Sequence, residues 1–487
     1  MSDPNPAVPP SRRLTRGTMA SYGFGAVAYG VKDSGFGTFL LLFYNQVVGL
    51  PAATVGFVVM MALVIDAFID PAVGFLSDRT RTRWGRRHPW MYASALPIMV
   101  GWILLWQPPA ALSQPTTLVW LFVTAVIVRS AVSAYEVPSV ALTPELTADY
   151  DERTRIMAYR YLFGWAGGLT MLLSAYLIFL APTLEYTNGL LNRAGYTGFA
   201  ITGALLIGTA ILVSAIGTHR EIPRLPQPQI ERQSLAASFA ELAETVRNRP
   251  FVILMLAGVC AYTNQGISYA LSNYLYSYVW GFKGGAFAIL TAMLFSGVFV
   301  AFLVAPRVGR RFGKARAATA AVAIGAIVQT TPYALRFAGV FPQPGDAALL
   351  PAFFTCVIAS TACNVTAFIL GASMMADVVE ASEEQTGRRS EGVFFAGSFL
   401  VQKCTSGLGI FASGLILSAA AFPAKAVPGQ VPVAVIDRLT LIYLALYLTL
   451  ACLSAFFFTR FPFGRAEHEA RLAALKASDS PRNSAEF

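Results

Sequence analysis

Long apolar segments recur along almost the whole chain, and they limit what it can fold into. A helix needs about 20 mostly apolar residues to cross a bilayer, because each residue advances it by about 1.5 Å. Charged residues make up only 13% of the 487 residues, against roughly 25% in soluble proteins. The chain is therefore predicted to be an all-α membrane protein with twelve transmembrane helices. The predicted spans are 19–44, 52–77, 90–107, 117–143, 156–180, 197–217, 251–279, 285–305, 315–338, 348–378, 391–420 and 436–460.

The charge of the connections predicts how the chain lies in the membrane. Basic or mixed-charge residues fill the connections at 81–88, 150–155, 218–250, 307–316 and 383–391, whereas the alternate connections are nearly uncharged. Because basic connections stay on the cytoplasmic side, we expect both termini in the cytoplasm and the chain in a plasma membrane, namely a bacterial inner membrane. We therefore attribute the net charge of +10 to the basic connections that set the orientation of the chain in the membrane. We expect contact with the lipid bilayer and none with nucleic acid.

The longest polar connection divides the predicted spans into six and six. It starts with a proline-rich stretch and continues as ERQSLAASFAELAETVRNR, which has the spacing of a helix on the membrane surface. Gly-Arg-rich turns follow both the second span (SDRTRTRWGRRHP) and the eighth (APRVGRRFGKAR). Two parallel six-helix halves, with a substrate site between them at mid-membrane, are the plan of the major facilitator fold that we predict. The predicted parts are a cytoplasmic tail (1–18), an N-terminal half (19–217), a cytoplasmic middle loop (218–250), a C-terminal half (251–461) and a second cytoplasmic tail (462–487).

Two aspartates interrupt the second apolar run. Asp66 and Asp70 stand four residues apart, so both carboxylates lie on one helix face. Ionisable groups inside a span are costly and by default suggest a functional site. Two carboxylates stay ionised together only with a cation close by, and oxygen ligands suit hard cations. The pair favours a Na⁺ or H⁺ site; the alternative is that Asp70 caps a helix break at Pro71, or that both aspartates bind cytoplasmic arginines.

The fourth apolar run also carries charge. Arg129 and Glu136 stand seven residues apart and therefore share a helix face. Glu136 is a candidate to complete the cation site, with the hydroxyl of Ser133 one turn away; the alternative is a structural ion pair between Arg129 and Glu136. Pro138 and Pro144 are expected to break or kink this helix and to free carbonyl groups that line a cavity.

Two lysines complete the charges inside apolar runs. Lys403 lies deep in the eleventh run and needs a partner, for which the aspartates of the second run are candidates; snorkelling to the membrane surface is the alternative. Lys32 and Asp33 interrupt the first run, and adjacent residues on a helix point about 100° apart. We predict that this segment, with Tyr29, contacts the solute. Mutual neutralisation of Lys32 and Asp33 is the alternative.

Several segments together resemble one known family. The most specific is DAFIDPAVGFLSDRTRTRWGRRHPW. The similarity extends over both halves through SYGFGA (21–26), VVGL (47–50), LTPELTADYDERTRIMAYR (142–160) and MMADVVEASEEQTGRRSEGVFF…VQK (374–403). These segments resemble the melibiose permease-like glycoside–pentoside–hexuronide:cation symporters of the major facilitator superfamily. The resemblance implies cation-coupled symport of a small organic solute such as a sugar or glycoside.

The resemblance also implies roles for single residues. The implied cation ligands are Asp66, Asp70, Glu136 and Ser133, with Na⁺ possible at the two aspartates. Glu136 and Arg160 would also hold the solute, and Lys403 would lie near the cation. Together with the charges described above, the predicted solute contacts are Tyr29, Lys32, Asp33, Arg129, Glu136, Arg160 and Lys403.

Three positions depart from the sugar-transporting members. Their first-span aspartate falls at Gly30, the polar residue before their second aspartate at Ile69, and their aromatic residue after the fourth-span proline at Val140. Asp33 lies one turn beyond Gly30, about 5 Å along the helix. Sodium-dependent lysophospholipid symporters likewise keep the acidic pair without the first-span aspartate. A lysolipid-like or amphipathic anionic solute therefore stays open, as do H⁺ coupling beside Na⁺ and proton-coupled export.

The basic turn after the second span is a predicted cytoplasmic gate. Ion pairs there would hold the cytoplasmic side shut until the halves rock; the alternative is that these residues only fix topology. The predicted gate residues are Asp78, Arg79, Arg83, Arg86 and Arg87, with Asp149, Glu152 and Asp377 as acceptors.

An enzyme is not expected. The three histidines, His88, His219 and His468, lie in loops or the tail, and no nucleophile–base set or metal-ligand spacing occurs. The chain is expected to act as a monomer without a cofactor, with a small solute and a coupling ion, Na⁺ or H⁺, as its ligands.

Overall fold

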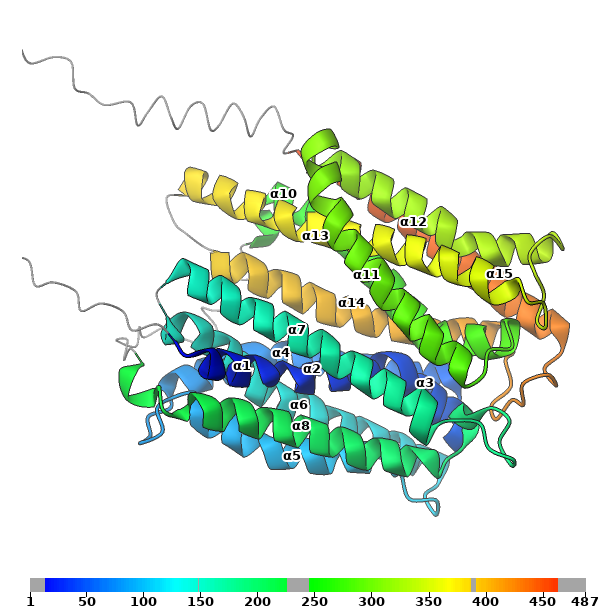
Figure 1. The fold of residues 1–487 in the computed structure, drawn as a ribbon, viewed down its shortest axis with the longest axis horizontal. Coiled ribbons are helices and arrows are strands. Elements are labelled where there is room, and N and C mark those ends of the chain that lie inside the picture. Colours follow the sequence, from blue (N-terminus) through cyan, green and yellow to red (C-terminus); the bar gives the residue numbers. More distant parts are fainter. Residues whose placement is uncertain (1–13, 148, 226–244, 387–390, 463–487) are drawn as a thin grey trace, which may run out of the picture. The chain divides into compact units, whose positions relative to one another are not determined.

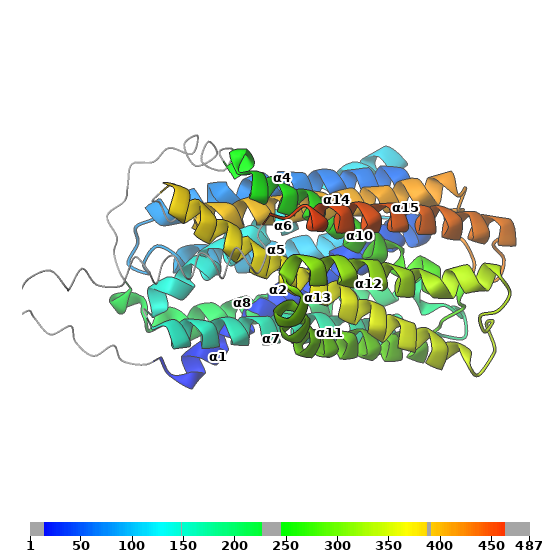
Figure 2. The same ribbon diagram turned by 90° about the horizontal axis from the view of Figure 1, so that it is seen from above.

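The described part of the chain is almost entirely helical (Figure 1 and Figure 2). The computed structural model describes residues 14–147, 149–225, 245–386 and 391–462. Within these ranges, 11 helices are long and apolar enough to cross a membrane. One more, the first in the chain, runs from Arg16 to Val48 as consecutive α- and π-helical segments. The predicted all-α membrane fold is therefore confirmed.

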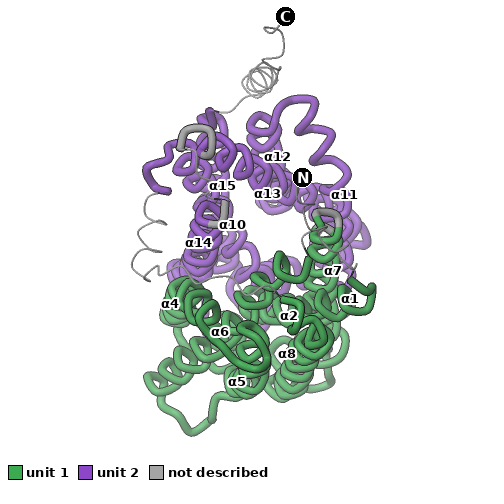
Figure 3. Tube along the Cα trace, turned by 90° about the vertical axis from the view of Figure 1, so that its left-hand side faces the viewer, with its two compact units in different colours: residues 1–235, 283–285 green, residues 236–282, 286–487 purple. Residues whose placement is uncertain are grey.

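The chain divides into two compact units, coloured separately in Figure 3. Unit 1 comprises residues 1–235 and 283–285, and unit 2 comprises residues 236–282 and 286–487. The helices of unit 1 are α1 (Arg16–Phe24), α2 (Ala26–Ser34), η1 (Gly35–Phe39), α3 (Leu40–Leu42), η2 (Phe43–Val48), α4 (Ala52–Arg79), α5 (His88–Trp106), α6 (Gln114–Leu146), α7 (Tyr150–Ser174), η3 (Ala175–Phe179), η4 (Gly189–Leu191), α8 (Gly195–His219) and η5 (Ile222–Arg224). Those of unit 2 are η6 (Thr245–Arg247), α10 (Arg249–Tyr274), η7 (Leu275–Val279), α11 (Gly285–Phe312), α12 (Lys314–Phe337), α13 (Leu349–Thr386), α14 (Glu391–Ala419) and α15 (Val433–Thr459).

Several helices extend past the predicted spans into polar residues. Helix α7 begins at Tyr150, where the side chain of Asp149 accepts a hydrogen bond of 2.8 Å from the backbone N–H of Glu152. Such a cap satisfies a backbone donor that has no partner within the helix. The surface helix predicted within the middle loop falls largely on residues 226–244, outside the described residues.

Prolines do not interrupt the charged helices. Helix α4 continues through Pro71, and α6 continues through both Pro138 and Pro144. The alternative of a helix break at Pro71, with Asp70 as its cap, is therefore wrong. A break in the fourth span is also wrong, whereas a kink there stays a prediction. A proline removes one backbone hydrogen bond and crowds the preceding turn, but in a span the neighbouring helices can hold the helix together.

The two units share several pairings of corresponding helices. In unit 1, α5 packs against α6 and α8, and α2 packs against α7. In unit 2, α12 packs against α13 and α15, and α10 packs against α14. Since each unit holds six spans, the shared pairings indicate an internal repeat of a six-helix unit.

Glycines allow the closest of these helix contacts. A Cβ atom on Gly30 would lie 2.0 Å from the carbonyl oxygen of Gly164, and one on Gly409 would lie 2.5 Å from that of Thr263. Membrane helices gain stability from such backbone approach, because lipid supplies no hydrophobic force between them. Position 30 thus serves the contact between α2 and α7.

Replacing Gly30 by alanine should separate α2 from α7. The added Cβ meets backbone atoms, which cannot yield as a side chain can, and overpacking of this kind costs about 1–3 kcal/mol. We expect a lower melting temperature of the purified protein in detergent. In the matched variant Gly371→Ala, within α13, the new Cβ meets no described atom within 4 Å, and its helix should gain roughly 0.5–1 kcal/mol. Equal melting temperatures for the two variants would contradict the packing argument.

Candidate functional site

Asp66 and Arg129 form a buried ion pair between α4 and α6. The Arg129 Nε atom donates to Asp66 Oδ2 at 3.0 Å, and Nη2 makes a shorter contact with the same oxygen. Ser133 Oγ donates to the other oxygen, Oδ1, at 2.7 Å. The side chains of Asp66 and Arg129 are only 1% and 5% exposed. Both oxygens of Asp66 are thus bonded to side chains of α6.

Asp70 and Glu136 stand further along the same two helices. Both residues are half-buried. Glu136 forms no hydrogen bond or ion pair with another residue among those described, although its charge acts on Arg129 and Arg160. The structural pair expected as an alternative between Arg129 and Glu136 is wrong, because Arg129 pairs with Asp66.

In the first span, Lys32 forms an ion pair with its neighbour Asp33. Lys32 Nζ lies 2.7 Å from Asp33 Oδ1 and 4.3 Å from the centre of the Tyr29 ring. The Lys32 side chain is 2% exposed and that of Asp33 is 45% exposed. Mutual neutralisation of Lys32 and Asp33, the alternative drawn from the sequence, is therefore what the structure contains. A solute contact by Tyr29 or Asp33 stays a prediction.

Arg160 lies in a buried network of hydroxyl groups. From α7 its Nη1 atom donates to Ser139 Oγ at 2.8 Å and to the Tyr22 hydroxyl at 3.4 Å. The Tyr22 hydroxyl donates to the Ser139 carbonyl at 2.5 Å and is bonded to Thr143 Oγ1 at 2.6 Å. Arg160 has no carboxylate within ion-pair distance in the described ranges. Sequence reasoning identified Arg160 but missed the hydroxyl groups, which carry no charge or spacing signal.

Lys403 belongs to unit 2. It lies in α14 and is half-buried. Its pairing with the aspartates of α4 stays a prediction.

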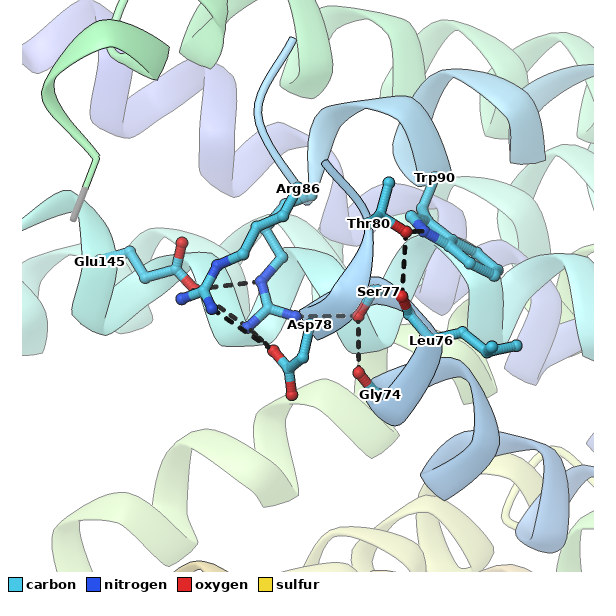
Figure 4. Close-up of polar contacts among 9 residues, drawn as sticks. Gly74, Leu76, Ser77, Asp78, Thr80, Arg86, Trp90 and Glu145 are labelled. Carbon is cyan, nitrogen blue, oxygen red and sulfur yellow. Dashed lines mark hydrogen bonds and ion pairs between the residues drawn. The ribbon is translucent and has the colours of Figure 1, made fainter. Parts of the chain in front are cut away.

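A second charge cluster ties the C-terminal ends of α4 and α6 to the turn before α5 (Figure 4). Arg86 and Arg87 converge on one oxygen of Glu145, at 2.7 and 3.0 Å. Arg87 also binds Asp78 Oδ1 at 2.5 Å and donates to Ser77 Oγ at 2.8 Å. The predicted basic turn is thus bound by Glu145, an acceptor that sequence reasoning missed. The available signal was an acidic residue at the end of the fourth apolar run.

The other predicted gate residues have different partners. Asp149 caps α7, and Glu152 accepts from Thr147 Oγ1 at 2.8 Å and from the backbone N–H of Leu14 at 3.1 Å. The Asp377 carboxylate, in unit 2, binds Lys314 at 2.5 Å. The guanidinium groups of Arg79 and Arg83 lie over the rings of Phe75 and Trp84, at 3.4 and 5.4 Å. The described pairs of Asp78, Arg86 and Arg87 all lie within unit 1, and their role as a gate stays a prediction.

Comparison with known proteins agrees with this architecture. The sequence pattern of the family described as MFS/sugar transport protein matches residues 21–465. The isoprimeverose transporter of Lactiplantibacillus pentosus is 26% identical, over 87% of this chain and 85% of that protein. A glucuronide carrier protein homolog of Escherichia coli is 26% identical, over 86% of each chain. The solved structure of the nucleoside transporter NupG has a TM-score of 0.58 at 15% identity and covers 92% of this chain and 100% of its own. The major facilitator fold is confirmed.

Replacing Asp66 by asparagine should destabilise unit 1. It leaves the guanidinium of Arg129 buried without its counter-charge, a change that costs about 3–5 kcal/mol. Melting in detergent should show the loss. The double variant D66N/R129Q should lose less than the two single changes together, because the unpaired charge is gone. As a control, Asp437→Asn breaks the partly exposed pair with Arg336 and should cost about 0–1 kcal/mol. If Asp66→Asn melts like Asp437→Asn, the pair is not the anchor described.

Glu145→Gln should loosen the turn that precedes α5. The two guanidinium groups would then share a neutral acceptor and repel each other, and such charge-assisted bonds contribute about 1.5–3 kcal/mol. Hydrogen–deuterium exchange of residues 80–90 should accelerate by roughly 10- to 100-fold, since each 1.4 kcal/mol is tenfold. Glu185→Gln is the control, because Glu185 is exposed. Unchanged exchange in Glu145→Gln would show that the turn is held by other contacts.

Proposed function

Because the chain belongs to the MFS/sugar transport protein family, whose pattern covers residues 21–465, we propose that it is a cation-coupled symporter of a small organic solute. The coupling ion is Na⁺ or H⁺, and the mechanism is alternating access. The acidic residues of α4 and α6, namely Asp66, Asp70 and Glu136 with Ser133 beside them, form the coupling site. The protein acts as a monomer in a bacterial inner membrane with both termini in the cytoplasm.

The ionisable residues within two neighbouring helices support this proposal. Helices α4 and α6 hold the three carboxylates, with Arg129 on α6 and Arg160 on α7. Ionisable residues inside spans are costly and by default suggest a functional site, and carboxylate oxygens suit a hard cation. By reciprocity, a solute that binds better when the cation is present must also tighten cation binding.

We propose a sugar or glycoside as the solute. The names of two relatives, an isoprimeverose transporter and a glucuronide carrier homolog, support this class. Arg160 and the hydroxyl groups of Tyr22 and Ser139 would supply hydrogen bonds that suit a hydroxyl-rich molecule. Asp33, one turn beyond Gly30, and Lys403 are further proposed contacts.

A lysolipid-like or amphipathic anionic solute is the second candidate. It is favoured by Gly30, which packs against α7 and offers no carboxylate to sugar hydroxyls. It is also favoured by Arg160, whose described partners are hydroxyl groups. An arginine with neutral partners suits a carboxylate, sulfonate or phosphate group.

Proteoliposome transport tests the proposal. A panel of glycosides, glucuronides and lysolipids is first screened by thermal shift, and uptake of each stabilising solute is then measured with imposed Na⁺ and H⁺ gradients. We expect uphill accumulation of one class. Glu136→Gln should abolish accumulation, because it removes one carboxylate of the proposed coupling site. Glu185→Gln should behave as the unaltered protein. Efflux driven by an opposing proton gradient would instead identify an exporter, and equal uphill uptake by Glu136→Gln would refute the coupling site.

A further inference from the structure

The hydroxyl groups around Arg160 bind one edge of its guanidinium, and within the described chain the other edge has no partner. We infer that Tyr22 and Ser139 are positioning residues. They bind the Nη1 atom of Arg160 and thereby present its Nε and Nη2 atoms to a pair of oxygen atoms on the solute. This inference rests on the proposed function and refines its solute site, because Tyr22 and Ser139 then act through Arg160 and not on the solute itself.

The bound edge of the guanidinium is fixed by several contacts. Nη1 donates to Ser139 Oγ at 2.8 Å and to the Tyr22 hydroxyl at 3.4 Å, and the guanidinium lies 5.4 Å from the centre of the Tyr22 ring. The Tyr22 hydroxyl is itself held, because it donates to the Ser139 carbonyl at 2.5 Å and is bonded to Thr143 Oγ1 at 2.6 Å. Tyr22 and Ser139 are both 0% exposed. A solute therefore meets neither hydroxyl directly.

The other edge of the guanidinium is open. Every hydrogen bond that Arg160 donates within the described chain comes from Nη1. Nε and Nη2 reach solvent, since neither atom is buried without a partner, although only 9% of Arg160 is exposed. These two atoms form one side of the planar fork that binds paired oxygen atoms. A carboxylate presents such a pair, and so do two adjacent hydroxyl groups.

The segment SYGFGA brings α1 against α7 at this arginine. A Cβ atom on Gly23 would lie 2.6 Å from the Cβ atom of Tyr159 and 3.2 Å from the backbone nitrogen of Arg160. Helices in a membrane approach this closely where a small residue stands at the contact. Gly23 thus allows the neighbouring Tyr22 to reach the guanidinium. The positioning role gives this segment, which is part of the family resemblance, a physical purpose.

A guanidinium held in advance should bind a solute more tightly. An arginine side chain is otherwise free to adopt many rotamers, and ordering it during binding weakens affinity. Since Nη1 is held before the solute arrives, Arg160 needs little further ordering. Loss of one of the two hydroxyl groups should therefore raise the KM for transport and leave the maximal uptake rate unchanged.

Tyr22→Phe and Tyr44→Phe form a matched pair for the test. Both tyrosines are fully buried in the first span, and each donates its hydroxyl to a backbone carbonyl of another helix, Tyr22 to Ser139 and Tyr44 to Leu105 at 2.7 Å. Both variants should melt at a lower temperature. In proteoliposome uptake, KM should rise by about 5- to 20-fold in Tyr22→Phe, the range expected for a hydrogen bond to a charged group. It should not rise in Tyr44→Phe.

The probes are 4-nitrophenyl β-D-glucuronide, which carries a carboxylate, and 4-nitrophenyl β-D-glucoside, which offers only hydroxyl groups. A rise in KM for the glucuronide alone identifies the carboxylate as the partner of Nε and Nη2. An equal rise for both probes identifies a pair of hydroxyl groups. Either result supports the inference.

A double-mutant cycle separates positioning from general stability. Arg160→Lys keeps the charge and loses the fork, so its KM should rise. Adding Tyr22→Phe to Arg160→Lys should raise KM no further, because Tyr22 acts through the guanidinium. Ser139→Ala should behave as Tyr22→Phe does.

The inference and the proposed function fail in different ways. If the unaltered protein takes up a probe, but Tyr22→Phe has the KM of Tyr44→Phe or adds its full effect to that of Arg160→Lys, the inference alone is overturned. Uptake of neither probe would refute the proposed sugar class and, with it, the solute contact that the two hydroxyl groups are inferred to position.

Discussion

An ion pair between two membrane helices, Asp66 with Arg129, fixes the charge arrangement of unit 1. In a low-dielectric interior each of these charges alone would be far more costly than the pair. The pair joins the middle of α4 to α6, and Ser133 adds a second bond one turn away. Asp70 and Glu136 are then placed by helix geometry, since they follow on the same faces. The surroundings of the other carboxylates of α4 and α6 therefore depend on the pairing of Arg129 with Asp66.

Each unit contains an ion pair between its third and fourth spans, and the two units use different residues for it. In unit 1, Arg86 before α5 binds Glu145 at the C-terminal end of α6. At the corresponding place in unit 2, Lys314 at the start of α12 binds Asp377 in α13. In both, a basic residue at the start of the third span meets an acidic residue on the fourth. The repeat visible in the Gly-Arg turns of the sequence thus has a physical counterpart in each unit.

Features that depend on local composition, such as the spans, could be predicted from the sequence. Contacts between side chains of different helices could not. Every span appeared as an apolar run, since the bilayer imposes its length on each helix separately. The partner of Arg129 could not be found in this way, because spacing along one helix indicated Glu136 whereas the tertiary neighbour is Asp66. Glu145 was missed for the same reason. Lys32 and Asp33 show a third limit: their Cβ directions diverge, yet the long lysine side chain bends back to its neighbour.

The packing of the first span determines which of its polar side chains stay exposed. Gly30 lies in close backbone contact with Gly164. An aspartate at position 30 would therefore push α2 away from α7. Tyr29 and Asp33 stand one turn apart on another face of the helix and leave that contact, with 39% of Tyr29 and 45% of the Asp33 side chain exposed. The close contact at Gly30 thus leaves Tyr29 and Asp33 as exposed polar side chains of this part of the first span. In the proposed symporter, a solute would meet these two side chains and no carboxylate at position 30.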